Sequence, residues 1–363
     1  MTAIPHSRPT IVPGIEEAVA RVVASGQHAG GAERQALESA LAERVGVSDG
    51  VAVQSGFAAL HIALLALGVE SGHRVVVPSY VCASLLHALA AVRAEPIVAD
   101  IDPRTFNLNA ATVLAAIQRE VGDPTMIRAV IAPHMMGVPV DTDGWRLTAP
   151  VIEDCAMALG SRVAGIDGPR DVGAWGECST FSFYATKMLS SGQGGMVLTA
   201  NRALAEDARD RQRYDNREAW RPCWNYPLPD LAASVARAQL PFLDDFLLRR
   251  RQLAARYDDA FDALGIERQQ APAGTEPNHF RYVILASDAA SRDHLQNALA
   301  EAQIEAKRPV FRPLHEYLQL EDEHYPGTAS VQARALSLPI YPALTDADQD
   351  RVIAAVTAAL QTS

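Results

Sequence analysis

The chain has 363 residues, of which 48% are hydrophobic and 21% are charged, and its formal net charge is −11. These values are typical of a globular protein with two domains, or with one large α/β body and a smaller appendage, and they argue against disorder. The acidic balance disfavours binding to nucleic acid or to an anionic membrane, because both partners require a basic face.

Two further features bear on membrane and metal chemistry. No apolar run reaches the roughly 18 residues of a membrane-spanning helix, and the first ten residues lack the basic and apolar segments of a secretory signal. The four cysteines, Cys82, Cys155, Cys178 and Cys223, lack the paired spacing of a metal site. We therefore expect reduced thiols, no metal ion and a cytoplasmic location.

The first 200 residues predict two helices followed by an alternation of strands and helices. One helix begins at residue 15 and stops at Gly26, and the next covers 32–45 and stops at Gly46. The predicted strands are 51–53, 75–77, 96–99, 128–132, 151–153, 180–183 and 196–198, with helices such as 58–67 and 84–94 between them. This alternation predicts a mostly parallel sheet covered on both faces. A glycine-rich stretch separates the last two strands, so we expect an antiparallel edge strand there.

The C-terminal part of the chain has a different pattern. A long helical region covers 230–264, a strand follows in HFRYVILA, and a helix is predicted over 289–302. An LSLPIYPAL segment and a closing helix over 346–361 complete the chain. We therefore divide it into residues 1–235, an N-terminal segment with a large domain, and residues 236–363, a smaller α/β domain.

Ligands of open α/β sheets bind at the carboxyl ends of the strands, so residues directly after each strand are candidates for a site. Gly56 lies just after the first strand and begins a helix, where free N–H groups suit a phosphate, although such a sequence is also a common helix cap. Asp154 ends the 151–153 strand, and a buried carboxylate requires a partner. That partner is a structural cation, a helix N-terminus or the protonated nitrogen of a bound ring.

Lysine is scarce in this chain, because its 32 basic residues are 30 arginines and only two lysines, Lys187 and Lys307. Lys187 lies at a strand end before a glycine-rich loop, where it is either a surface lysine on a turn or an amine for imine chemistry. Lys307 has no such setting, and we expect it to be a solvated charge. Phosphate donors, a carboxylate and an amine at successive strand ends form the set that pyridoxal phosphate requires.

Many segments, in order, resemble the DegT/DnrJ/EryC1/StrS family of pyridoxal-phosphate-dependent aminotransferases over nearly the whole length. They include ASGQHAGG, QSGFAALHIALLALGV, VVVPSYVCAS, PIVADIDPRTFNLN, APHMMGVPVD, VIEDCAMALGS, STFSFYATKMLSSGQGGMV, WNYPLPDLAASVARAQL, RPLHEYL and SLPIYPALT. The resemblance implies an α/β fold of the aspartate-aminotransferase type (fold type I). It also implies a homodimer that binds the cofactor at the subunit interface.

The resemblance assigns roles position by position. Lys187 matches the Schiff-base lysine and Asp154 matches the aspartate on the pyridine nitrogen. The phosphate ligands that it implies are Ser182, the backbone of Phe57 and Ala58 after the Gly56 turn, and Asn225 toward the partner subunit's phosphate. His134 and His315 lie in family-like segments, and we expect packing or loop roles for them. Trp220, Trp224 and Tyr226 either line the acceptor pocket or pack the interface.

Three positions depart from the family pattern. Phe57 replaces a threonine, which removes a hydroxyl but keeps the backbone N–H. Cys82 stands where an aromatic ring usually stacks on the cofactor, with Tyr80 as a candidate substitute. Met157 replaces the glutamine or histidine that bonds the ring hydroxyl, and it cannot donate a hydrogen bond.

The resemblance implies transfer of an amino group from an amino acid, L-glutamate in the family, to a keto acceptor such as a nucleotide-linked ketosugar. The altered pocket leaves two alternatives: a pyridoxal-phosphate enzyme of secondary metabolism with a non-sugar substrate, and a cofactor-binding regulator or scaffold without transaminase activity. The family's dehydratase branch has histidine in place of the lysine, so Lys187 argues against that branch.

Overall fold

The computed structural model describes residues 2–142, 145, 149–164 and 168–361. Its centre is a seven-stranded sheet in the order β1-β9-β8-β5-β4-β2-β3. The strands are β1 (Asp49–Val53), β2 (Arg74–Pro78), β3 (Glu95–Ala99), β4 (Ile127–Pro133), β5 (Val151–Asp154), β8 (Cys178–Ser182) and β9 (Gly195–Thr199). Strands β3, β2, β4, β5 and β8 are parallel, as the apolar runs predict.

Strand β9 is antiparallel as expected, but it does not lie at the edge of the sheet. It pairs with β8 on one side and with β1 on the other, both antiparallel. The glycine-rich loop returns the chain directly beside β8, and β1 then pairs along the free side of β9 from Asp49↔Thr199 to Val53↔Gly195. The edge is therefore β1, and the expectation of an edge position for β9 was wrong.

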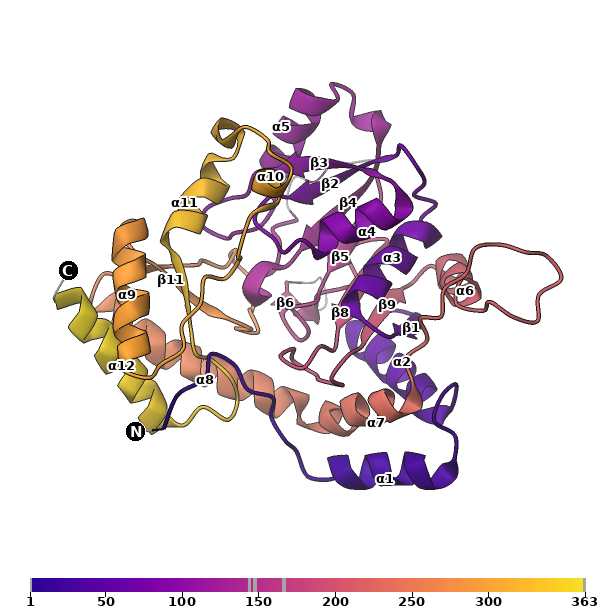
Figure 1. Ribbon diagram of the computed structural model, residues 1–363, viewed down its shortest axis with the longest axis horizontal. Helices are drawn as coiled ribbons and strands as arrows, with labels where there is room; N and C mark the ends of the chain where they lie inside the picture. Colours follow the sequence, from indigo (N-terminus) through magenta and orange to yellow (C-terminus); the bar gives the residue numbers. More distant parts are fainter. Residues whose placement is uncertain (1, 143–144, 146–148, 165–167, 362–363) are drawn as a thin grey trace.

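Helices cover both faces of this sheet (Figure 1). The helices in residues 1–239, which also contain the strands of the central sheet, are α1 (Ile15–Ser25), α2 (Ala32–Val45), α3 (Gly56–Ala66), α4 (Ser84–Val92), α5 (Ala110–Glu120), α6 (Arg202–Asp210) and α7 (Asp230–Gln239). Val51 and Val53 of β1 pack in the core with α3, while Ala52 between them packs in a second core with α2 and α7. This alternation is what a strand buried on both faces requires.

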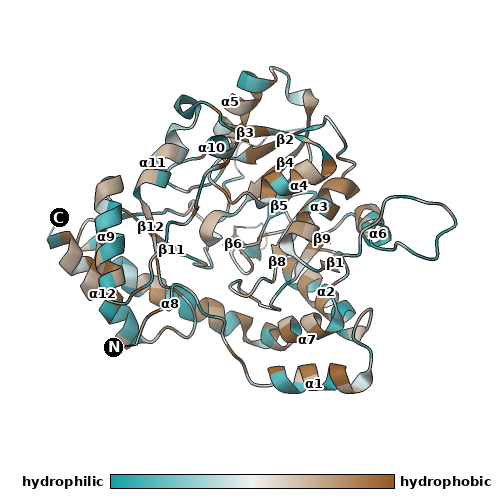
Figure 2. Cartoon of the chain, in the orientation of Figure 1, coloured by the Kyte–Doolittle hydropathy of each residue, from teal (hydrophilic) through white to brown (hydrophobic). Residues whose placement is uncertain are grey.

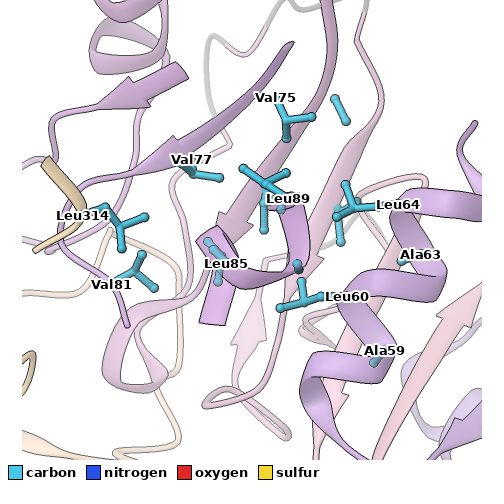
Figure 3. Close-up of a cluster of buried hydrophobic side chains, with 14 of the residues drawn as sticks. Ala59, Leu60, Ala63, Leu64, Val75, Val77, Val81, Leu85, Leu89 and Leu314 are labelled. Carbon is cyan, nitrogen blue, oxygen red and sulfur yellow. The ribbon is translucent and has the colours of Figure 1, made fainter. Parts of the chain in front are cut away.

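Helix α3 is held firmly by the first of these cores (Figure 3). Its Leu60 and Leu64 face the side chains of β2 and α4, among them Val75, Leu85 and Leu89. All of these side chains are fully or almost fully buried. The position of the N-terminus of α3 is therefore set by the packing of the whole helix.

A second, antiparallel sheet consists of β10 (Glu267–Arg268), β11 (Tyr282–Leu285) and β12 (Ala335–Leu338). Its helices are α8 (Leu243–Asp262), α9 (Ala289–Glu301), α10 (Leu314–Tyr317), α11 (Pro326–Arg334) and α12 (Asp346–Gln361). Near the start of the chain, Ile4 forms a bridge with Ile304 and packs in the core of this part. The N-terminal residues thus cross to the smaller sheet, and the division at residue 235 remains our proposal.

The predicted helical region 230–264 is two helices rather than one. Helices α7 and α8 are separated by a short 3₁₀ turn, Leu240–Phe242, which contains Pro241. A proline removes a backbone donor and clashes inside an α-helix, which explains the break. In Figure 1 the two helices follow one another from the central sheet toward the smaller sheet.

Two small hairpin strands, β6 (Arg162–Val163) and β7 (Arg170–Asp171), complete the β structure of the described residues. Within those residues, none of the helices is both long and apolar enough to cross a membrane. Figure 2 shows hydrophobic colouring along the central strands and hydrophilic colouring on the loop that projects beyond α6.

Candidate active site

The N-terminus of α3 presents free backbone donors at the carboxyl end of β1. Ser55 is the N-cap residue, and its hydroxyl accepts a hydrogen bond of 3.1 Å from the N–H of Ala58. The first N–H groups of a helix have no intrahelical partner. In the described residues, those of Gly56 and Phe57 have no other partner either. The geometry thus favours Gly56 and Phe57, rather than Phe57 and Ala58, as backbone donors to an anion.

Gly56 brings this helix start against the end of β8. A Cβ atom on Gly56 would lie 2.9 Å from the Cβ and 3.1 Å from the Oγ of Ser182. Contacts below 3 Å are not tolerated between such atoms, so only glycine fits without movement. The Ser182 hydroxyl therefore lies beside the free N–H groups of α3, as the resemblance implies for a phosphate site.

Asp154 lies at the end of β5, with 8% of its surface exposed. Its Oδ1 accepts a 3.0 Å hydrogen bond from the N–H of Ala156, and no cation forms an ion pair with it among the described residues. Burial raises the pKa of this carboxyl group, while the Ala156 N–H and the charge of Lys187 oppose the change. Such a group is stabilised as an anion by a further donor.

Lys187 lies in the loop between β8 and β9, where its N–H donates to the carbonyl oxygen of Tyr184 over 2.8 Å. Burial lowers the pKa of its amine, Asp154 and Cys82 oppose that change, and Arg281 adds to it. Its Nζ lies 5.0 Å from the centroid of the Phe280 ring. A larger share of the amine is thus uncharged near neutral pH than in a solvated lysine, which is the state that attacks a carbonyl.

Directly behind Asp154, a buried pair of side chains supports β5. The Nδ1 of His134 accepts a hydrogen bond from the N–H of Val140 over 2.9 Å, so its Nε2 carries the proton and donates to Glu153 over 3.0 Å. Glu153 also accepts from the N–H groups of Gly173, Trp175 and Gly176. Burial alone would raise the pKa of Glu153, but these donors more than offset it and lower that pKa.

Cys155 lies with His134 and Glu153 in a group whose ligand atoms are all within 4.8 Å of one another. The hydrogen bonds just described use both ring nitrogens of His134 and both carboxylate oxygens of Glu153. Burial holds the pKa of the Cys155 thiol well above its usual range, so the sulfur is a neutral, poor metal ligand. This group therefore acts as structural support for β5.

The structure places Cys82 and Met157, two of the positions that depart from the family pattern, and Tyr80, the candidate substitute for the stacking ring, as follows. Cys82 is exposed and near enough to Lys187 to affect the pKa of its amine. Tyr80 is fully buried in the core with its ring 5.8 Å from that of Phe106, so it does not substitute for a stacking ring at Cys82. Met157 is half-buried, and its carbonyl oxygen accepts a 3.0 Å hydrogen bond from Asn278.

Asn225 forms no hydrogen bond with these residues in the described part of the chain. It is exposed and lies in the segment between α6 and α7. Its neighbour Tyr226 accepts the N–H of Gln54 over 2.7 Å and contacts His61 through its hydroxyl. The Trp224 ring lies edge-on to His61 at 5.0 Å. The aromatic residues thus fix this segment against α3, and Asn225 between them is exposed.

Sequence reasoning missed Phe280 and Arg281, which lie near Lys187, and Asn278, which holds their segment. The side chain of Asn278 donates to the carbonyl oxygens of Met157 and Leu159 and accepts from the N–H of Phe280. It therefore joins the segment before β11 to the loop after Asp154. The motif HFRYVILA gave a strand, but no local signal indicated that its first residues approach the lysine.

A sequence model of the DegT/DnrJ/EryC1/StrS aminotransferase family matches residues 9–357. The chain belongs to this family. The aminotransferase TlmJ from Streptoalloteichus hindustanus is 30% identical to it, with a TM-score of 0.89 over 99% of this chain and 100% of that one. DesV from S. venezuelae is 30% identical, with a TM-score of 0.86 over 94% and 93% of the two chains. The sugar aminotransferase CalS13 from Micromonospora echinospora is 25% identical, with a TM-score of 0.84 over 98% and 99%.

The protein is thus a pyridoxal-phosphate-dependent aminotransferase of fold type I, and its residues fit that cofactor. The free donors of α3 and the Ser182 hydroxyl suit the phosphate, and the Lys187 amine suits the aldehyde. The buried carboxylate of Asp154, without a cation of its own, suits a protonated ring nitrogen. The hydroxyl of Thr180, paired in register with Asp154, is also buried without a partner among the described residues.

Proposed function

We propose that this aminotransferase moves an amino group from L-glutamate to the keto group of a nucleotide-linked sugar, as a cytoplasmic homodimer. The observation that carries the proposal is the Lys187 amine, one of two lysine amines in the chain, which lies in the loop after β8 with a lowered pKa that the charge of the buried Asp154 opposes. The match to DesV and to the sugar aminotransferase CalS13 supports a sugar as the acceptor.

We assign Lys187, Asp154, Gly56, Phe57 and Ser182 to cofactor binding within one subunit, with Ala58 at the same helix start. Pyridoxal phosphate supplies an electron sink for the substrate carbon that loses a proton. Lys187 Nζ accepts that proton as a base and later returns it as an acid, because burial keeps part of the amine uncharged. Asp154, as an anion, keeps the ring nitrogen protonated.

Asn225 is assigned to the cofactor phosphate of the partner subunit. Its exposure supports this role, since an exposed side chain is available to a partner subunit. Cys82 and Met157 line the same centre with small or apolar groups in place of ring and hydrogen-bonding contacts. The thiol of Cys82 is smaller than an aromatic ring, and the thioether of Met157 offers no hydrogen-bond donor to a bound cofactor.

The experiment compares Lys187→Ala with Lys307→Ala, which removes the other lysine. Lys307 is exposed and forms an ion pair with Glu305 at 2.8 Å, so its loss should be silent. We expect borohydride reduction and peptide mapping to find the cofactor on residue 187 in the wild type and in Lys307→Ala, and nowhere in Lys187→Ala. L-Glutamate should yield 2-oxoglutarate and pyridoxamine phosphate with the first two proteins. An adduct elsewhere, or no 2-oxoglutarate from wild type, would refute the proposal.

A further inference from the structure

The hydroxyl of Thr180 is a buried polar group that the fold leaves without a partner. Thr180 lies in β8 with 1% of its surface exposed, and its Oγ1 atom forms no hydrogen bond with any residue that the structure describes. Its backbone, by contrast, is paired with Asp154 on one side and with Val197 on the other. An unpaired buried hydroxyl costs free energy, so this atom indicates a hydrogen bond that forms in the working enzyme.

Thr180 and Asp154 project from the same face of the central sheet. They are register partners on the adjacent parallel strands β8 and β5, and such partners point to the same side. Cys178 and Ile152, which lie two residues before them on the two strands, both pack in the core that contains α3. Side chains two residues apart on a strand share a face, so the hydroxyl and the carboxylate both face α3.

The other neighbours of the Thr180 side chain narrow the choice of its partner. Val197, its register partner on β9, is apolar. Ser182, two residues further along β8, has its Oγ against the start of α3, 3.1 Å from a Cβ built on Gly56. Adjacent strands are about 4.8 Å apart, so rotation of either side chain brings the Thr180 hydroxyl to the Asp154 carboxylate. Asp154 is therefore the acceptor that the fold offers to this hydroxyl.

The carboxylate of Asp154 has few donors for a buried anion. Its Oδ1 accepts one N–H, from Ala156, and burial raises the pKa of the group. Glu153, the preceding residue, is better supplied, because it accepts from His134 and from three backbone N–H groups. Those donors lower the pKa of Glu153 despite its burial. One more donor would stabilise the charged form of Asp154 in the same way.

Ser179 provides a comparison, because its hydroxyl is also buried without a partner in the described part of the chain. It is the register partner of Glu153, and it points to the opposite face of the sheet from Thr180. The two hydroxyls thus differ in the carboxylate beside them, since Glu153 already has its donors and Asp154 does not. A substitution at Ser179 is therefore the matched control.

We propose that the Thr180 hydroxyl donates a hydrogen bond to the carboxylate of Asp154 when the cofactor is bound, and thereby holds Asp154 as the anion that faces the ring nitrogen. An anionic carboxylate is a stronger acceptor than a protonated one, so this bond favours a proton on the ring nitrogen over a proton on Asp154. Thr180 acts through Asp154 and is a positioning residue. The inference rests on the assignment of Asp154 to the ring nitrogen under the proposed function.

The experiment measures the affinity of the apo-protein for pyridoxal phosphate and for its 1-deaza analogue, in which a C–H group replaces the ring nitrogen. The variants are Thr180→Val, which removes the hydroxyl, Thr180→Ser, which keeps it, Asp154→Asn and the control Ser179→Ala. We expect Thr180→Val to bind pyridoxal phosphate about 3- to 10-fold more weakly, and the deaza analogue no more weakly, than the wild type. Thr180→Ser should recover most of the loss, and Ser179→Ala should match the wild type with both ligands.

A spectroscopic measurement separates this role from a purely structural one. With cofactor that carries ¹⁵N at the ring nitrogen, the chemical shift at pH 7 reports whether that nitrogen is protonated. In Thr180→Val the shift should move toward the value of an unprotonated pyridine, and in Asp154→Asn it should move further. In Ser179→Ala it should stay at the wild-type value, because a change in packing alone does not move the proton.

Two results would overturn the inference. One is an equal loss of affinity for both ligands in Thr180→Val, which would assign the hydroxyl to packing or to another part of the cofactor. The other is an unchanged affinity and an unchanged chemical shift in that variant. In both cases Asp154→Asn would still lose affinity for pyridoxal phosphate alone. If Asp154→Asn showed no such selective loss, the assignment of Asp154 under the proposed function would be wrong, and this inference with it.

Discussion

A Cβ atom on Gly56 would lie 2.9 Å from the Cβ of Ser182, so the first turn of α3 and the end of β8 meet where only a hydrogen atom fits. Two segments that are far apart in the sequence thus bring backbone N–H groups and a hydroxyl to one point. The close approach depends on both residues, so it can be tested by substituting Gly56 or Ser182.

We expect Gly56→Ala to destabilise the apo-protein by about 1–3 kcal/mol, because the new methyl group forces the helix start and the strand apart. Alanine is the better helix former, so helix propensity alone predicts the opposite sign. The free energy of unfolding in urea measures the effect. The double variant Gly56→Ala with Ser182→Gly restores the space, and its loss should be smaller than the sum of the two single losses. A stabilised Gly56→Ala protein would contradict the close contact.

The amine of Lys187 should become reactive at lower pH than a solvated lysine amine, because burial lowers its pKa. Reductive methylation of the apo-protein with formaldehyde, followed by peptide mapping at several pH values, measures this directly. Lys307, which is exposed, serves as the reference in the same digest.

Two variants should shift that profile in opposite directions. Asp154→Asn removes a charge that raises the pKa of Lys187, so half-maximal labelling should move to lower pH. Arg281→Gln removes a charge that lowers it, so labelling should move to higher pH. Shifts of the same sign in both variants would show that the charges do not act on the amine as described.

Glu153→Gln should destabilise the protein at pH 7 by about 2–4 kcal/mol. The amide cannot accept all the hydrogen bonds from His134 and from the N–H groups of Gly173, Trp175 and Gly176, which leaves buried donors unpaired.

The effect of Glu153→Gln should depend on pH. The folded-state pKa of Glu153 is lowered, so its charge stabilises the fold above the ordinary carboxyl pKa of about 4.3 and this contribution is lost as the pH falls further. Chemical unfolding at pH 7 and pH 4 should therefore show a larger difference at pH 7. Glu301→Gln, at an exposed site, is the control.

Asn278→Ala should cost about 2–4 kcal/mol, since it removes the acceptor of Phe280 N–H and the donor to the carbonyl oxygens of Met157 and Leu159. Denaturant unfolding measures the loss, and Asn297→Ala, on the exposed side of α9, should change it by less than about 0.5 kcal/mol. Because Asn278 positions Phe280 near Lys187, the variant should also take up pyridoxal phosphate more slowly. Unchanged stability would mean that these hydrogen bonds do not hold the segment.

The strands of the central sheet could be predicted within a few residues, because strands buried on both faces are short apolar runs. The position of β9 inside the sheet could not be predicted, because the pairing of β1 with β9 is a contact between segments far apart in the sequence. The break between α7 and α8 at Pro241 could have been predicted from the proline itself, but the apolar pattern continues across it.

By itself, the sequence determined the fold class and the small set of residues with the required chemistry, because a scarce lysine, an aspartate at a strand end and a glycine before a helix are local patterns. The family was implied by the resemblance of many segments in order. The tertiary structure alone decided which side chains surround them. It buried the Tyr80 ring in the core, left the N–H groups of Gly56 and Phe57 free, and brought Phe280 and Arg281, which precede β11, close to Lys187. Such neighbours result from packing between distant segments, for which the sequence carries no local periodicity.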